Sequence, residues 1–236
     1  MTGALPLSAK LESRQGVGPF ERVVLVLQGG GALGAYQAGV YQALHEAKIE
    51  VTWICGTSIG GINGALIAGN RPERRVGRLR EFWDAITRPP IGIPDPALFA
   101  AWKGSGPGHL TDRLSAVSSM LYGVPDFFTP RPFPPLIAAA RRPDLVSCYD
   151  TAPLRATLAR LVDFDLINSK SVRFSVAATN VCTGAPVYFD NLQHRITSAH
   201  IMAGASLPPS FPPSENIDGA SGGGGKVDSS AVNWAI

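Results

Sequence analysis

Short apolar runs alternate with apolar residues at helical spacing near the start of the chain. Residues 22–28 (RVVLVLQ) and 51–55 (VTWIC) are the runs. The apolar residues between them recur three to four positions apart: Tyr36, Val40, Tyr41 and Leu44. This pattern predicts a first strand buried on both faces of a parallel sheet, a helix over residues 34–47 and a second, parallel strand.

Later segments continue the same alternation of helices and strands. Residues 71–87 are amphipathic and predict a helix, as do the residues that follow a cap at Asp150 or Thr151. Residues 173–178 (RFSVAA) and 187–190 (VYFD) predict two more strands. The chain is therefore expected to be an α/β protein with a mainly parallel central sheet.

Two segments depart from this pattern. Residues 88–135 are rich in proline and aromatic side chains and contain one short predicted helix, near residues 111–121. A long irregular segment within a compact domain is usually functional, so we interpret 88–135 as an insertion that forms an acyl pocket or lid. Residues 1–19 read as a polar lead-in, which leaves one domain over residues 20–236.

Composition narrows the class of protein. The chain has 236 residues, 45% hydrophobic and 17% charged, with a formal net charge of +3, and this balance argues against nucleic acid as a partner.

Cys55, Cys148 and Cys182 are widely spaced and predict neither disulfides nor a zinc site. We therefore expect no metal or cofactor, and a reducing, cytoplasmic location. The sequence shows no export signal, and its apolar segments are too short to span a bilayer, so membrane contact would be peripheral.

The strongest chemical motif follows the second strand. Gly56-Thr57-Ser58-Ile59-Gly60 matches G-x-S-x-G, in which a sharp strand-to-helix turn exposes the serine hydroxyl. The small-residue segment GGINGALIAG follows and can lie close to a sheet. Ser58 is therefore the candidate nucleophile, although a serine that only caps the next helix would use the same turn.

A glycine-rich segment follows the first strand. Gly29, Gly30, Gly31, Ala32 and Gly34 would present backbone N–H groups at a helix N-terminus, which suits an oxyanion hole. The same spacing fits a dinucleotide-binding loop. That interpretation needs an acidic residue at the end of the second strand, where this chain has Cys55 and Gly56.

The general base has several candidates. A Ser-His-Asp esterase could be assembled from one acid and one histidine: Asp163, Asp165 or Asp190 with His194 or His200. Alternatively, a carboxylate could act directly. Asp218 precedes Gly219 and would need burial near Ser58 to raise its pKa, while an Asp-Gly pair is also a common turn.

These segments together resemble the patatin-like phospholipases. The matching stretches are VVLVLQGGGALGAYQAGVYQAL and CGTSIGGINGALIAGN, with VAATNVCTG and MAGASLPPSFPP later in the chain. The resemblance implies a three-layer α/β/α fold and a lipid acyl hydrolase, of phospholipase A or esterase type. It also implies a Ser58–Asp218 dyad, the glycine-rich segment as oxyanion loop, and a lipid or other ester as substrate.

Two departures from the family pattern stand out. Leu33 occupies a position where many members carry Arg or Lys. Residues 219–236 include a GASGGGG run and predict an atypical terminus, truncated or altered, in which Asp228 rivals Asp218 as the base. If neither carboxylate reaches Ser58, the alternative is a catalytically impaired lipid-binding remnant of the same fold.

Overall fold

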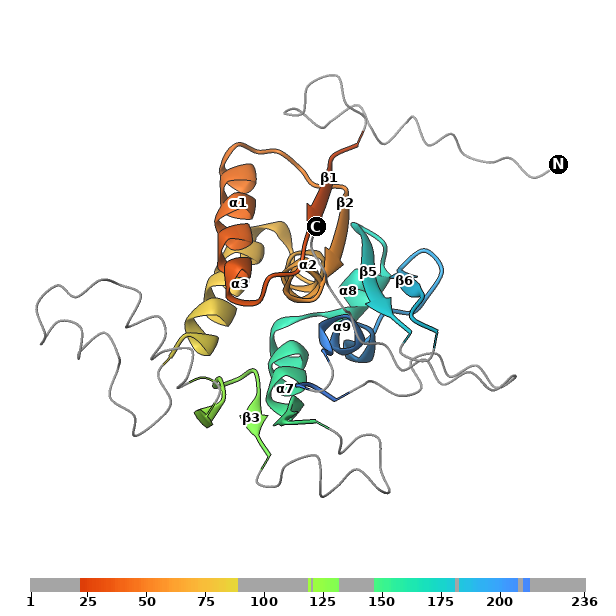
Figure 1. Cartoon of the computed structure of the whole chain (residues 1–236). Coiled ribbons are helices and arrows are strands. Elements are labelled where there is room, and N and C mark those ends of the chain that lie inside the picture. Colours follow the sequence, from red (N-terminus) through yellow and green to blue (C-terminus); the bar gives the residue numbers. More distant parts are fainter. Residues whose placement is uncertain are drawn as a thin grey trace, which may run out of the picture.

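The computed structural model describes residues 22–88, 119, 121–131, 147–180, 183–207 and 210–212. Helices and strands alternate along them (Figure 1). In chain order the elements are β1 (Val24–Leu27), η2 (Gly31–Leu33), α1 (Gly34–Glu46), β2 (Trp53–Thr57), α2 (Ile59–Ala68), α3 (Pro72–Ile86), β3 (Thr129–Pro130), β4 (Tyr149–Asp150), α7 (Ala152–Leu161), α8 (Phe164–Asn168), β5 (Arg173–Thr179), β6 (Pro186–Asp190) and α9 (Ser198–Ala205).

The central sheet has the strand order β1-β2-β5-β6. β1, β2 and β5 are parallel, with Leu27 opposite Gly56 and Gly56 opposite Val176, whereas β6 is antiparallel to β5. The predicted mixed α/β class with a mainly parallel sheet is therefore confirmed. Because the carboxyl ends of β1 and β2 are neighbours, the segments that leave them start about 4.8 Å apart at one edge of the sheet.

Helix α2 forms the centre of the core. All ten of its residues are buried, and it packs against β1, β2 and β5. Small side chains let this helix lie close to the sheet: a Cβ at Gly64 would lie 2.9 Å from Phe174. Around it, α3 contributes Leu79 and Phe82, and α7 contributes Leu154 and Leu158, all of them buried.

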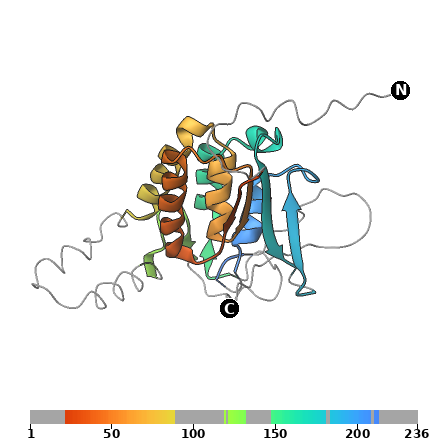
Figure 2. The same ribbon diagram turned by 90° about the horizontal axis from the view of Figure 1, so that it is seen from above.

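The described helices gather on one side of the sheet (Figures 1 and 2). On the opposite face Val24 is 42% exposed and Val26 73% exposed. The prediction that the first strand is buried on both faces is therefore wrong for the described part of the chain: Leu25 and Leu27 turn toward the core, as does Val23 just before β1. The described residues supply the sheet and one helical side of the predicted three-layer arrangement.

Most elements predicted from periodicity are present, with small shifts. The second strand begins at Trp53 rather than at Val51, and the arginine-rich helix spans Pro72–Ile86. Helices α8 and α9 were not predicted. Most of the helix expected near residues 111–121 and most of the 88–135 segment lie outside the described residues, although residues 119, 121 and 122 are described and helical; residues 1–19 and 219–236 also lie outside them.

A polar cluster occupies the exposed face of the sheet, at the amino end of β5. The Asp190 carboxylate accepts hydrogen bonds from Arg173 Nε (2.8 Å) and Ser175 Oγ (2.7 Å). Trp53 Nε1 donates to Ser175 Oγ, and the Arg173 guanidinium lies 3.8 Å from the centre of the Trp53 ring. Burial would raise the pKa of Asp190, but hydrogen bonds from the Leu192 N–H, Ser175 and Arg173 outweigh it and lower that pKa.

This lowered pKa predicts a pH-dependent contribution to stability. A carboxylate whose pKa is lower in the folded state stabilises the fold above its unfolded pKa of about 4, and the contribution is lost as pH falls through the folded value. We expect Asp190→Asn to reduce the free energy of unfolding at pH 7 by about 1–3 kcal/mol, and the deficit to shrink below about pH 4.

Urea unfolding at pH 7 and pH 3 measures this difference. Asp165→Asn is the matched control, because Asp165 pairs with Arg195 on the surface, where the two side chains are 85% and 75% exposed. Surface pairs contribute little, so the control should change stability little at either pH. An Asp190→Asn deficit that is equal at both pH values would contradict the prediction.

Candidate active site

Ser58 sits in a strained turn between β2 and α2. Its backbone has φ 53° and ψ −126°, a conformation that costs a non-glycine residue about 1–3 kcal/mol. Ser58 occupies the N-cap position of α2, yet its side chain makes no cap hydrogen bond in that described helix. The turn has the geometry of a nucleophile elbow, and the hydroxyl is not used for capping.

The flanking glycines are required by close backbone contacts. A Cβ at Gly60 would lie 2.1 Å from the carbonyl oxygen of Leu27, and a Cβ at Gly56 would lie 2.4 Å from the carbonyl oxygen of Gly60. Both distances are much shorter than the van der Waals contact distance between a carbon and an oxygen atom, so a side chain at either position would clash with the backbone. The first turn of α2 therefore lies directly against the end of β1, where the glycine-rich segment begins.

Helix α9 supports the serine from its other side. The Ser58 N–H donates a hydrogen bond to the carbonyl oxygen of Gly204, at 3.1 Å. Gly204 is itself packed closely, since a Cβ there would lie 2.7 Å from the Ala177 carbonyl oxygen of β5. Sequence periodicity missed α9. Its N-terminal signal is the reciprocal capping of Thr197 and His200.

The glycine-rich segment leaves β1 at the same edge of the sheet. Gly30 and Gly31 have φ 155° and 55°, and both are exposed, as is Ala32. Gly34 differs, because it is buried and a Cβ there would lie 2.4 Å from Ile59 Cγ1. The structure thus brings the segment predicted as an oxyanion loop to the elbow, with Gly34 as the packing contact between them.

Three buried or partly buried side chains, those of Asn63, Gln37 and Trp83, join this segment to α2, and none was proposed as a site residue from the sequence. Asn63, which is fully buried, donates from Nδ2 to the Gly34 carbonyl oxygen (2.9 Å) and to Gln37 Oε1 (3.0 Å). It accepts a hydrogen bond from Trp83 Nε1 (3.1 Å). Gln37 Nε2 donates to the Gln28 carbonyl oxygen (2.7 Å). A buried Asn in an otherwise apolar helix was the available signal, since buried amides need partners.

Both carboxylates predicted as the base, Asp218 and Asp228, lie outside the described residues. Asp163 caps α8, and its N–H binds the Gly69 carbonyl oxygen at the far end of α2, about 15 Å from Ser58 for a helix of this length. Asp165 belongs to the same short helix α8 and pairs with Arg195.

The remaining members of the predicted Ser-His-Asp set are engaged elsewhere. Asp190 binds Arg173 and Ser175, as described above. His194 Nδ1 accepts the Asp190 N–H, and His200 Nδ1 accepts the Thr197 N–H. None of these hydrogen bonds involves Ser58, so they do not assemble a Ser-His-Asp triad among the described residues.

Cys55 is the thiol nearest to Ser58 along the chain. Burial raises the pKa of this thiol above its usual value, so it stays protonated at neutral pH. The described residues also contain no group of three or more His, Cys, Asp or Glu side chains that could hold a metal ion. Because the Cys55 thiol stays protonated, Ser58 is a better candidate nucleophile than Cys55.

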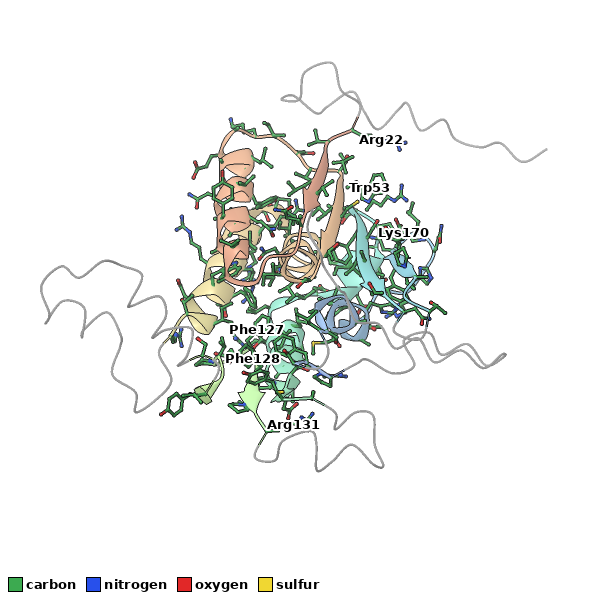
Figure 3. All side chains as sticks on the ribbon, viewed as in Figure 1. Arg22, Trp53, Phe127, Phe128, Arg131 and Lys170 are labelled. Atoms are coloured by element: carbon green, nitrogen blue, oxygen red, sulfur yellow. The ribbon has the colours of Figure 1, made fainter. Side chains whose placement is uncertain are left out.

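An aromatic cluster lies beside α7. Phe127, Phe128, Tyr149 and Phe211 are in mutual ring contact, and Phe127 also contacts Phe82 of the core. Figure 3 shows Phe127 and Phe128 together below the sheet, away from Trp53. This part of the predicted lid segment is thus packed onto the folded domain; the role of the segment stays a prediction.

Exposed apolar side chains occur in and next to the segments that lead to the candidate site. Leu33, which lies within the glycine-rich segment, is 77% exposed, and Tyr36, two residues after that segment, is 80% exposed. Leu207, 44% exposed, follows the end of α9. None of the described helices combines the length and the apolar character that crossing a membrane requires.

Comparisons with known proteins point to one family. The model of the patatin-like phospholipases matches residues 25–229. Lysophospholipase nte1 of Aspergillus terreus is 46% identical over 69 residues, which are 26% of this chain and 4% of that protein. Human patatin-like phospholipase domain-containing protein 6 is 46% identical over 66 residues, 28% of this chain and 5% of that protein. The chain thus spans only a small part of the length of these relatives.

Solved structures were also found to be similar, and one of them is a bacterial protein. VipD from Legionella pneumophila has a TM-score of 0.41 and 16% sequence identity, over 84% of this chain and 44% of that chain.

The close contact at Gly60 gives a stability prediction. We expect Gly60→Ala to destabilise the fold by about 3 kcal/mol or more, because the clash is with backbone and cannot be relieved by a rotamer change. Gly39→Ala in α1 is the matched control, since a Cβ there meets nothing within 4 Å. The control should stabilise by about 0.5–1 kcal/mol through helix propensity. Urea unfolding of both variants checks this, and equal midpoints would refute it.

Proposed function

Because the chain belongs to the patatin-like phospholipase family, we propose that it is a lipid acyl hydrolase of phospholipase A or esterase type. The observation that carries the proposal is the strained turn at Ser58. Its hydroxyl makes no capping hydrogen bond to α2, and the turn leaves the sheet at the same edge as the glycine-rich segment. Strain of this kind persists only where the surrounding structure enforces it, and it is found most often at reactive sites.

The proposed reaction has two steps. Ser58 Oγ attacks the acyl carbonyl carbon while Asp218 takes the hydroxyl proton, and the N–H groups of the Gly29–Ala32 segment stabilise the oxyanion. The ester bond breaks, and the leaving alcohol takes the proton from Asp218. Water then attacks the acyl-serine with the same carboxylate as base, which releases the fatty acid and restores Ser58.

Labelling with a fluorophosphonate probe tests the nucleophile. We expect wild-type protein to be labelled and to hydrolyse a p-nitrophenyl ester, and Ser58→Ala to lose both, with a fall in kcat of at least about 1000-fold. Asp218→Asn should lose turnover to a similar extent, while Asp228→Asn should retain it. The reverse result would assign the base to Asp228.

Other outcomes would overturn the assignment. Lipid binding without hydrolysis, unaffected by Ser58→Ala, would identify the chain as an impaired lipid-binding remnant. Turnover that survives both aspartate substitutions but is lost in His194→Ala or His200→Ala would favour the Ser-His-Asp esterase.

We further propose that the exposed apolar residues beside the site contact the lipid surface that holds the substrate. Leu33 and Tyr36 are the most exposed large apolar side chains of the described residues, and they lie next to the Gly30–Gly31 turn. Exposed apolar groups at one edge of a protein favour contact with a membrane or a lipid aggregate. The contact would be peripheral, and it would bring the elbow to the substrate.

A double variant tests this surface. Leu33→Ser with Tyr36→Ser should reduce hydrolysis of phospholipid vesicles about 100-fold or more, because roughly 1.5 kcal/mol or more of apolar burial is lost per side chain. Its turnover of a water-soluble ester should change less than about 2-fold. Leu192→Ser removes an equally apolar side chain, 50% exposed, after β6 at the opposite end of the sheet, and serves as control. Equal losses on both substrates would contradict the proposal.

A further inference from the structure

The amide of Asn63 has a defined orientation. Trp83 Nε1 can only donate, so the atom that it contacts at 3.1 Å must be the acceptor Oδ1. Nδ2 then faces the Gly34 carbonyl oxygen and Gln37 Oε1, both of which accept. The indole N–H of α3 therefore sets the direction in which an α2 side chain donates its two hydrogen bonds.

These bonds secure both ends of the glycine-rich segment. Gly34 ends it and is bound by Asn63 directly. Gln28 precedes it and is bound by Gln37 Nε2 at 2.7 Å, while Gln37 is itself bound to Asn63. The segment between residues 28 and 34 contains two positive-φ glycines and would otherwise have few constraints on its conformation. Both ends of the segment are thus hydrogen-bonded, directly or through Gln37, to α2, the helix that follows Ser58.

We propose that Asn63 and Gln37 are positioning residues, which hold the N–H groups of residues 29–32 in register with Ser58 Oγ for oxyanion stabilisation. This inference rests on the proposed acyl-transfer function. Neither side chain touches substrate. Their effect is geometric: oxyanion donors act only when they are fixed within a few tenths of an ångström of the developing charge, and an error of about 1 Å can cost about 100-fold in rate.

The alternative is a purely structural role, in which Asn63 is a buried amide that only satisfies its own hydrogen bonds. Under that reading, loss of the network would lower stability and leave the chemistry of the remaining folded protein unchanged. Gln37 separates the two, because it is only half-buried and its removal should leave the Asn63–Gly34 and Asn63–Trp83 bonds in place.

The primary test is Gln37→Met, which keeps side-chain length and removes both hydrogen bonds. We expect the rate of fluorophosphonate labelling and kcat for a soluble ester to fall about 10-fold, with KM within about 2-fold, since the defect concerns charge that develops in the transition state. Asn63→Asp should cost about 100-fold. The double variant should be no slower than Asn63→Asp alone, because both changes break one network.

Gln42→Met is the matched control on the same helix. Gln42 forms its hydrogen bonds with Glu46 and Arg80, both outside the glycine-rich segment. It should leave labelling and kcat unchanged. Hydrogen exchange supplies a readout independent of activity: amides of residues 29–34 should exchange faster in Gln37→Met and at the wild-type rate in Gln42→Met.

The outcomes separate this inference from the proposed function. If wild-type protein is neither labelled nor active, the proposed function fails, and the exchange data alone decide whether the network holds the segment. If wild-type protein is active and Gln37→Met matches Gln42→Met in kcat, the positioning role is overturned. Faster exchange with unchanged kcat also overturns it, because the network would then be structural only.

Discussion

The backbone contact between Gly60 and Leu27 is the constraint on which the rest of the site depends. Without a Cβ at position 60, the first turn of α2 reaches the end of β1, and the turn before it is forced into the strained conformation of Ser58. The Ser58 N–H bond to Gly204 closes the arrangement from the other side. The strain at Ser58 is sustained by the burial of the whole of α2.

Electrostatics divide the sheet into two ends with different properties. At the amino end of β5, Asp190 is held as a carboxylate by Arg173, Ser175 and the Leu192 N–H, so its proton affinity is low. A base for serine needs the opposite, a carboxylate whose pKa is raised toward neutrality. The carboxyl end, where Ser58 lies, carries the glycine-rich segment with its exposed Leu33 side chain. Asp190 thus serves stability, and the reaction proposed for Ser58 would take place at the other end.

Periodicity and motif spacing predicted much of this fold because they report local geometry. The helix from Gly34 and the elbow at Ser58 follow from the glycines and apolar spacing around them. The exposure of Val24 and Val26 could not be predicted, since an unbroken apolar run does not reveal how many layers cover a strand. Gly204 and Asn63 were missed for a related reason: each acts through a partner at least 26 residues away in sequence. Asp218 and Asp228, as the base, remain predictions.

The complete burial of α2 has a consequence for how the protein responds to heat. A ten-residue helix with no exposed side cannot fray or detach while the layers around it stay in place. Ser58 is the N-cap residue of this helix, so the turn at Ser58 should not unfold separately from the helix. Loss of the Ser58 turn geometry and loss of the native domain should therefore occur as one cooperative transition, in contrast to proteins whose functional groups lie on loops that loosen first.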